Sequence, residues 1–148
     1  MPGPFVYANA ELLDGKPYVA DIAGNYFGEC VSLVKHHIVP LQNVSTKAWK
    51  EGVNVIEALK KGTMIAKGTA IATFVNGRFE SGHGHAAFYI RHVFDPDGVI
   101  RIEVIEQYLG EKPSGGVKKR LLPNHGKDKN GNYINRSNNG RAFSVIML

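Results

Sequence analysis

The apolar residues of this chain change their spacing once, from a helical period in the first third to a strand-like pattern after residue 68. Between residues 28 and 39 they recur every three or four positions, and Pro40 closes the run, which predicts a helix. From Thr69 onward, apolar residues alternate or form short runs between turn sequences, which is typical of strands. One helix followed by antiparallel strands predicts the α+β class.

Turn sequences divide the second half of the chain into hairpins. Asn76-Gly77 and the Asp-Pro-Asp-Gly sequence at 95–98 are typical of tight turns between antiparallel strands. The other predicted elements are a short element near 11–14, helices at 45–51 and 53–60, and strands at 69–75, 78–80, 85–92, 99–108 and 142–147. Residues 110–140 are rich in glycine and asparagine and are predicted to be mostly turns.

Length and composition restrict the class of protein. The chain has 148 residues, 43% of them apolar, which is enough for one core and too few for two, so we expect one domain over 1–148. No apolar run approaches the roughly 20 residues of a membrane span. The N-terminus lacks the pattern of a secretory signal, so we expect synthesis in the cytoplasm. The single cysteine excludes an internal disulfide and a multi-cysteine zinc site.

The positive charge is concentrated at the end of the chain. Residues 111–148 carry eight basic and two acidic side chains, whereas the first 110 residues carry ten basic and eleven acidic ones. Such a segment indicates either an anionic partner or a solvated lysine-rich loop. Because the sequence shows no basic stripe interleaved with aromatic residues and no zinc-finger spacing, we expect no nucleic-acid partner.

Cys30 lies at the start of the predicted 28–39 helix. The unpaired N–H groups and partial positive charge of a helix N-terminus favour an ionised sulfur, and they could bind a developing oxyanion. Gly28, two residues earlier, would allow the backbone of a substrate to approach closely. The alternative is that Cys30 is a small buried apolar residue.

His85 begins a predicted strand after a glycine-rich stretch. An imidazole at this point could project into a cleft, accept the proton of a thiol and then protonate a leaving amine. His83 competes for this role, because residues two apart on a strand share a face. Either histidine could instead lie in a surface turn, and the two with Cys30 could also hold a metal ion.

Glu106 continues the apolar face that Ile100, Ile102 and Val104 form on the predicted 99–108 strand. Burying a carboxylate there is costly without a partner, and a histidine N–H is a suitable one that would also fix the tautomer. The alternative is that the strand reaches solvent at residue 106. The predicted 85–92 strand carries apolar residues on both faces. A buried pair of His85 and Glu106 therefore requires both faces of the sheet to be covered.

Three short motifs follow one another in the order expected of one enzyme family. They are Tyr-x-Gly-x-Cys at 26–30, Gly-His-Ala at 84–86 and Ile-Glu-Gln at 105–107, with Gly-Thr-Ala-Ile-Ala at 68–72 before the histidine motif. This order resembles the CHAP branch of the NlpC-type, papain-like cysteine amidases, over about residues 24–108. It is especially similar to small stand-alone bacterial proteins grouped with the type VI secretion amidase effectors.

The resemblance implies a papain-like (NlpC/CHAP) α+β domain and assigns roles to the matching positions, without a cofactor. Cys30 would be the nucleophile, His85 the base and Glu106 the orienting acid. Tyr26, Gly28, His83 and Gln107 would lie at the oxyanion or the substrate. The family often has Gln before the cysteine, where this chain has Glu29, which puts a side-chain oxyanion role for that position in doubt.

The implied reaction is hydrolysis of an amide bond in bacterial peptidoglycan through an acyl-thioester on Cys30. If type VI secretion delivers the protein to the periplasm of a target cell, the resemblance also implies a cognate immunity protein. Two other classes of function stay open on the residues alone. The same residues would serve a cysteine-dependent protein deamidase or acyltransferase, and a non-catalytic wall-binding module would use residues 111–148 instead.

Overall fold

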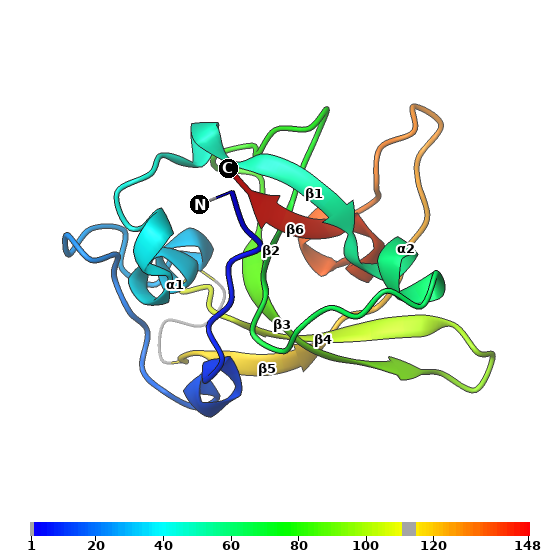
Figure 1. Cartoon of the computed structure of the whole chain (residues 1–148), viewed down its shortest axis with the longest axis horizontal. Helices are drawn as coiled ribbons and strands as arrows, with labels where there is room; N and C mark the ends of the chain where they lie inside the picture. The colour runs from blue at the N-terminus through cyan, green and yellow to red at the C-terminus, as the bar shows by residue number, and fades with distance from the viewer. Residues whose placement is uncertain (1, 111–114) are drawn as a thin grey trace.

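The computed structural model of the protein describes residues 2–110 and 115–148. Its centre is a six-stranded antiparallel sheet in the order β1-β6-β2-β3-β4-β5 (Figure 1). The strands are β1 (Lys50–Asn54), β2 (Ala70–Thr73), β3 (Ala86–Phe94), β4 (Ile100–Glu106), β5 (Lys118–Leu121) and β6 (Phe143–Met147). The helices are α1 (Cys30–His37), α2 (Val55–Lys60) and the 3-10 turns η1 (Ala10–Leu13), η2 (Val39–Leu41), η3 (Thr46–Ala48), η4 (Arg136–Asn138) and η5 (Gly140–Ala142). The α+β prediction is confirmed.

Both faces of the sheet are covered, as the apolar pattern of β3 requires. On one face Leu33 and Val34 of α1 pack in a buried cluster with Phe88. On the other face Ile56 of α2 packs in a second cluster with Tyr89. Alternate residues of β3 therefore enter two cores, and the two helices lie on opposite sides of the sheet (Figure 1).

The predicted helices form with shifted boundaries. The 28–39 helix is present as α1, and the 53–60 helix as α2, which Asn54 caps by accepting the Glu57 N–H at 3.1 Å. The helix predicted at 45–51 is wrong beyond its first turn. Ser45 caps only the 3-10 turn η3, after which the chain extends as β1 and pairs with β6.

The predicted hairpin turns form for the expected reasons. Asn76 and Gly77 both have positive φ, 51° and 76°, as the tightest hairpin turn requires. The strand predicted at 78–80 is reduced to a single bridge between Arg78 and Val75. In the next hairpin, Asp95 Oδ1 accepts two backbone N–H groups of the turn, and β3 pairs with β4.

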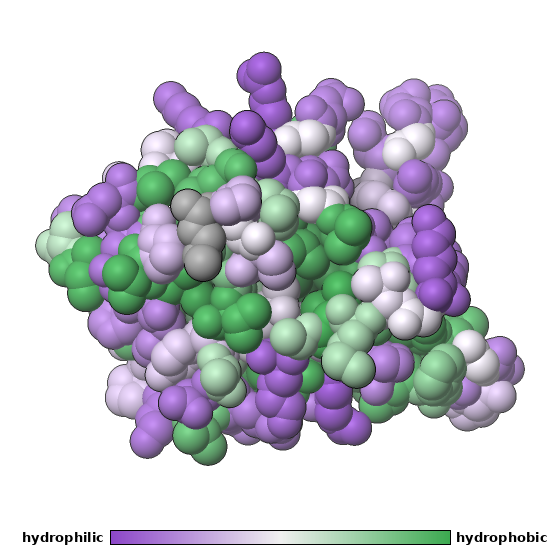
Figure 2. All heavy atoms as spheres, in the orientation of Figure 1, coloured by the Kyte–Doolittle hydropathy of each residue, from purple (hydrophilic) through white to green (hydrophobic). Residues whose placement is uncertain are grey.

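The prediction that residues 110–140 are mostly turns is wrong at β5. This strand adds to the sheet beside β4, with Lys118 opposite Glu106 and Arg120 opposite Val104. Residues 111–114 of the predicted segment lie outside the described residues. The exposed loop at 124–134, orange in Figure 1, is largely hydrophilic in Figure 2. The structure thus builds part of the basic segment into the sheet.

Candidate active site

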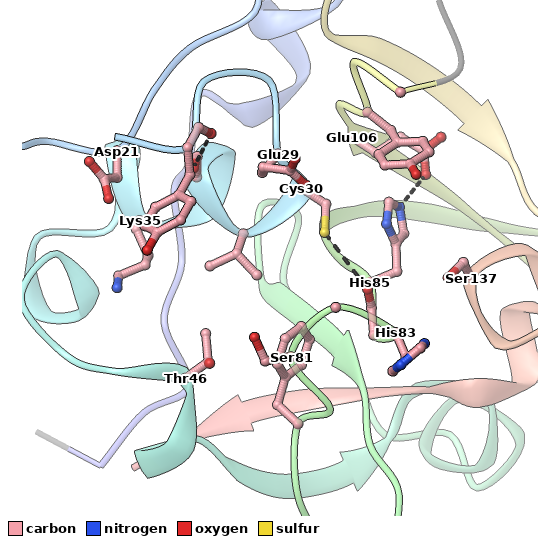
Figure 3. Close-up of a pocket in the computed structure, with 18 of the residues that line it drawn as sticks. Asp21, Glu29, Cys30, Lys35, Thr46, Ser81, His83, His85, Glu106 and Ser137 are labelled. Atoms are coloured by element: carbon pink, nitrogen blue, oxygen red, sulfur yellow. Dashed lines mark hydrogen bonds and ion pairs between the residues drawn. The ribbon is translucent and has the colours of Figure 1, made fainter. Parts of the chain in front are cut away.

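A cavity of about 1140 Å³ opens at the N-terminus of α1 (Figure 3). Its walls come from α1, from the loop before β3 and from residues 135–138, which lie on the side opposite Asp21 and Lys35. Cys30, His85 and Glu106 all line it. The structure therefore brings together the three residues that the sequence singled out.

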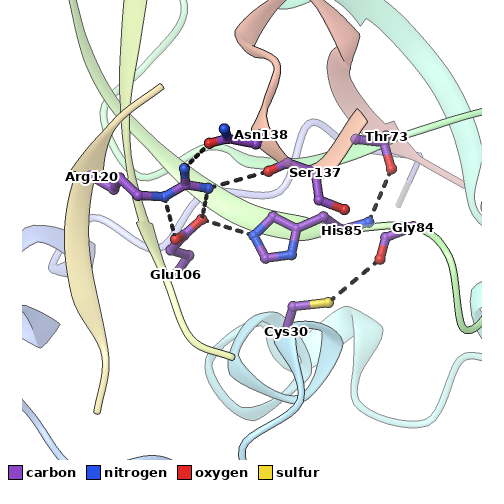
Figure 4. A network of polar contacts seen from close by, with 8 residues as sticks. All are labelled: Cys30, Thr73, Gly84, His85, Glu106, Arg120, Ser137 and Asn138. Atoms are coloured by element: carbon purple, nitrogen blue, oxygen red, sulfur yellow. Dashed lines mark hydrogen bonds and ion pairs between the residues drawn. The ribbon is translucent and has the colours of Figure 1, made fainter. Parts of the chain in front are cut away.

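Cys30 is the first residue of α1 and is 8% exposed, at the wall of the cavity. The first N–H groups of a helix have no acceptor within the helix, so those of Cys30 and its neighbour are available to an incoming oxygen. The sulfur lies 3.9 Å from the carbonyl oxygen of Gly84, beside the His85 ring (Figure 4). A thiol, an imidazole and a set of N–H donors thus meet at one point.

His85 directly precedes β3, and Thr73 of β2 fixes its backbone. The His85 N–H donates to Thr73 Oγ1 at 3.0 Å, and the Thr73 N–H donates to the His85 carbonyl at 2.9 Å. The ring packs edge-on against Phe143, with 6.1 Å between centroids. Because backbone and ring are both held, the imidazole has a defined orientation toward the cavity.

A buried ion pair joins His85 to Glu106. His85 Nε2 lies 2.8 Å from Glu106 Oε1, and the two residues are 6% and 3% exposed. An ionised carboxylate only accepts hydrogen bonds, so Nε2 donates and Nδ1 is left for the sulfur. Burial alone would lower the pKa of His85, but hydrogen bonds and charges at Cys30 and Glu106 outweigh it and raise the pKa to about 9.

Glu106 stays ionised because two cationic groups hold it. Burial raises its pKa, but hydrogen bonds from His85 and Arg120 reverse the effect and lower the pKa to about 2. Arg120 Nε donates to Oε2 at 2.6 Å, and Nη2 donates to Oε1 at 3.1 Å. The same guanidinium reaches Ser137 O at 3.2 Å and Asn138 Oδ1 (Figure 4).

The raised pKa of His85 predicts a titration outside the usual histidine range. In NMR spectra the ring resonances of His85 should titrate with a midpoint near 9, against about 6.5 for an unperturbed histidine. In Glu106→Gln the midpoint should fall, because the variant loses a carboxylate that favours the imidazolium. Since the folded pKa is raised, His85 stabilises the fold fully below the unfolded pKa and loses that effect as pH rises through the folded value. A wild-type midpoint near 6.5 would contradict the ion pair.

Two further predicted site residues line the cavity. Tyr26 is 74% exposed at the rim of the cavity, and its backbone has a φ of 54°. Ser32 holds this conformation, since its hydroxyl donates to the Tyr26 carbonyl at 2.7 Å. His83 is exposed in the loop before His85. Glu29, the extended residue just before α1, lines the same cavity. Tyr26 and His83 are thus placed where a substrate could reach them.

Gly28 and Gln107 do not line the cavity, where a substrate-binding residue would have to lie. Gly28 has φ of 78°, and a Cβ there would come within 2.5 Å of the Leu109 Cβ, so the close approach is made by the chain itself. Gln107 is fully buried; its side chain accepts the Val19 N–H and donates to the carbonyls of Val19 and Glu29. Both residues hold the segment before α1 in place, behind the cavity.

The described residues do not form the metal site that was the alternative for Cys30, His83 and His85. Within residues 2–110 and 115–148, no group of three or more His, Cys, Asp or Glu side chains is placed to hold a metal ion. The same part of the chain contains no helix of the length and apolarity needed to cross a bilayer.

Comparison with known proteins identifies the family. The family described as domesticated amidase effector 2 (Dae2) matches residues 7–146. This chain belongs to that family. A curated relative, the type VI secretion amidase effector 2 protein of Salmonella typhi, is 34% identical over 97% of this chain and 98% of its own length. A solved structure of type 6 secretion amidase effector 2 (Tae2) superimposes with a TM-score of 0.72 at 32% identity, covering 99% of this chain and 96% of the other.

Membership of the amidase effector 2 family makes the chain an amidohydrolase of the papain-like class that the motifs predicted. The match also extends past the 24–108 core over which the resemblance was seen, back to residue 7 and on to residue 146, and so covers β5 and most of β6. It therefore includes Arg120, which sequence reasoning missed. The sequence Lys-Lys-Arg-Leu at 118–121 has three basic residues in a row and no apolar alternation, so it carried no signal that Arg120 faces the site.

Proposed function

We propose that this protein is a cysteine-dependent amidase that hydrolyses an amide bond of bacterial peptidoglycan. One observation carries the proposal: Cys30, His85 and Glu106 converge on one cavity in a chain of the amidase effector 2 family. The family favours hydrolysis over the binding-module alternative, and the meeting of thiol and imidazole identifies the groups that would perform it.

The first half of the reaction makes a thioester. The Cys30 sulfur, whose proton passes to His85 Nδ1, attacks the carbonyl carbon of the amide, and the oxygen becomes an oxyanion at the N-terminal N–H groups of α1. His85 then returns its proton to the nitrogen, the C–N bond breaks, and the amine leaves. Glu106 accepts a hydrogen bond from the Nε2–H group throughout and stabilises the imidazolium.

The second half releases the acid. His85 takes a proton from a water molecule, whose oxygen attacks the thioester carbon. The C–S bond breaks, the proton moves to the sulfur, and the free carboxylic acid departs. The net result is one amide and one water converted into one amine and one acid.

The relatives are named as type VI secretion effectors, which supports a route of delivery and a partner. In our proposal the same route carries this protein to the periplasm of a target cell, where peptidoglycan lies. A producer of such an enzyme needs an immunity protein that closes the cavity at Cys30.

Digestion of purified sacculi tests the proposal. Mass spectrometry of the released muropeptides should show products that gain one water for each bond cut, with one new amine and one new carboxyl group. Protein whose Cys30 was first blocked with iodoacetamide is the control and should release none. Intact sacculi combined with ammonia release from protein-bound glutamine would overturn the proposal in favour of a protein deamidase.

A further inference from the structure

Arg120 meets Glu106 because of the register between β4 and β5. Arg120 lies opposite Val104, and Glu106 is two residues further along β4 on the same face. Diagonal neighbours of this kind are within reach of a long side chain. The contact follows from strand pairing, so it is fixed by the sheet rather than by a loose surface loop.

The guanidinium holds the carboxylate at both of its oxygens. Nε and Nη2 donate to Oε2 and Oε1 at 2.6 and 3.1 Å, so the group cannot rotate without breaking at least one bond. Arg120 is held in turn by the carbonyl of Ser137 and the side chain of Asn138 in η4. Every nitrogen of the guanidinium therefore has a protein acceptor.

We infer that Arg120 is a positioning residue of this centre: it holds Glu106 in the orientation that receives the His85 ring N–H, and it acts on catalysis only through Glu106. The inference rests on the proposed function. His85 occupies only Oε1 of the carboxylate, so Arg120 is what satisfies Oε2 of a side chain that is 4% exposed.

A second role for Arg120 must be separated from this one. Arg120 also lines the cavity, where a cation would attract a substrate carboxylate. A substrate-binding role predicts a raised KM, whatever residue stands at position 106. A positioning role predicts a lowered kcat that depends on Glu106.

A double-mutant cycle distinguishes the two roles. Arg120→Met should lower kcat by about 10²-fold, the usual cost of a small misplacement of a catalytic group, with KM nearly unchanged. In a Glu106→Gln background the same change should cost nothing further, because the group that Arg120 positions is already lost. Arg120→Lys should recover part of kcat, since it restores the charge without the two-pronged contact.

Lys119→Met is the matched control. Lys119 is adjacent on β5 and pairs at the surface with Glu11 at 3.2 Å, so its loss removes the same charge without touching Glu106. Its kcat should equal that of the wild type. If Arg120→Met leaves the buried Glu106 with His85 as its one cationic contact and fails to fold, Arg120→Met/Glu106→Gln lacks that buried charge and stays measurable.

Alkylation of Cys30 by iodoacetamide makes the test independent of the substrate. The rate should fall about tenfold in Arg120→Met and show no further fall when that change is added to Glu106→Gln. If sacculi are not cleaved but this alkylation pattern holds, the proposed function fails and the role of Arg120 stands. An equal loss on Arg120→Met in both backgrounds, or a rise in KM at constant kcat, would overturn the inference.

Discussion

Cys30→Ala will lower amide hydrolysis by about 10⁴-fold or more, because the variant has no sulfur to carry the acyl group. The fold should survive, since Cys30 is a small side chain at the first position of α1, and losing one buried sulfur costs only about 1 kcal/mol. The measurement is the rate of new amine termini from purified sacculi, with circular dichroism and thermal unfolding as the checks on folding.

Cys30→Ser is the informative companion variant. It keeps the shape of the side chain and a hydroxyl beside His85, but an alcohol is a far weaker nucleophile than a thiol at neutral pH. We expect it to be nearly as inactive as Cys30→Ala. If either variant kept more than about a hundredth of the wild-type rate, Cys30 would not be the nucleophile.

His85→Ala will lower kcat by about 10³-fold, because in the proposed mechanism one imidazole serves both as base to the thiol and as acid to the leaving amine. The matched control is His92→Ala, on β3, the strand that His85 directly precedes. His92 Nδ1 lies 3.1 Å from the Tyr89 hydroxyl, and His92 does not line the cavity. That control should keep the wild-type rate, measured on the same sacculi.

His83 provides the outcome that would contradict this assignment. It lies in the loop before His85 and faces the cavity, but it is exposed, whereas His85 contacts Glu106. If His83→Ala lost activity by a factor of about 10³ while His85→Ala lost little, His83 would be the base. The His85–Glu106 ion pair would then be only structural.

The interior of the fold could be predicted from sequence, and its edges could not. The central strands β2, β3, β4 and β6 carry the apolar patterns that burial demands, and all four were predicted. The missed strands β1 and β5 are the two edges of the sheet. Edge strands are commonly short and charged, which protects them from pairing with other chains, and both of these begin with lysine.

The same reason explains what was found and missed at the site. Cys30, His85 and Glu106 lie at the ends of elements with strong patterns, so their positions could be read from the helical and alternating periods. Arg120 lies on an edge strand without such a pattern. The roles of Gly28 and Gln107 depended on which distant segment packs against them, and spacing along the chain does not carry that information.

Some side chains of the basic segment form ion pairs within the protein, which the expectation of an anionic partner or a solvated loop did not include. Lys119 pairs with Glu11, Arg120 with Glu106, and Arg136 with Glu80 at 2.9 Å. These contacts join the basic end of the chain to the more acidic first part. Three basic side chains of the segment therefore help to close the fold and the cavity.

The central claim is that the Cys30 sulfur and the His85 ring act as one group. The rate of iodoacetamide alkylation at neutral pH measures this directly in the wild type and in His85→Ala. We predict that the wild type reacts at least about tenfold faster, because the imidazolium stabilises the ionised sulfur that reacts. Equal rates in the two proteins would contradict the account, since the reactivity of the Cys30 sulfur would then not depend on His85.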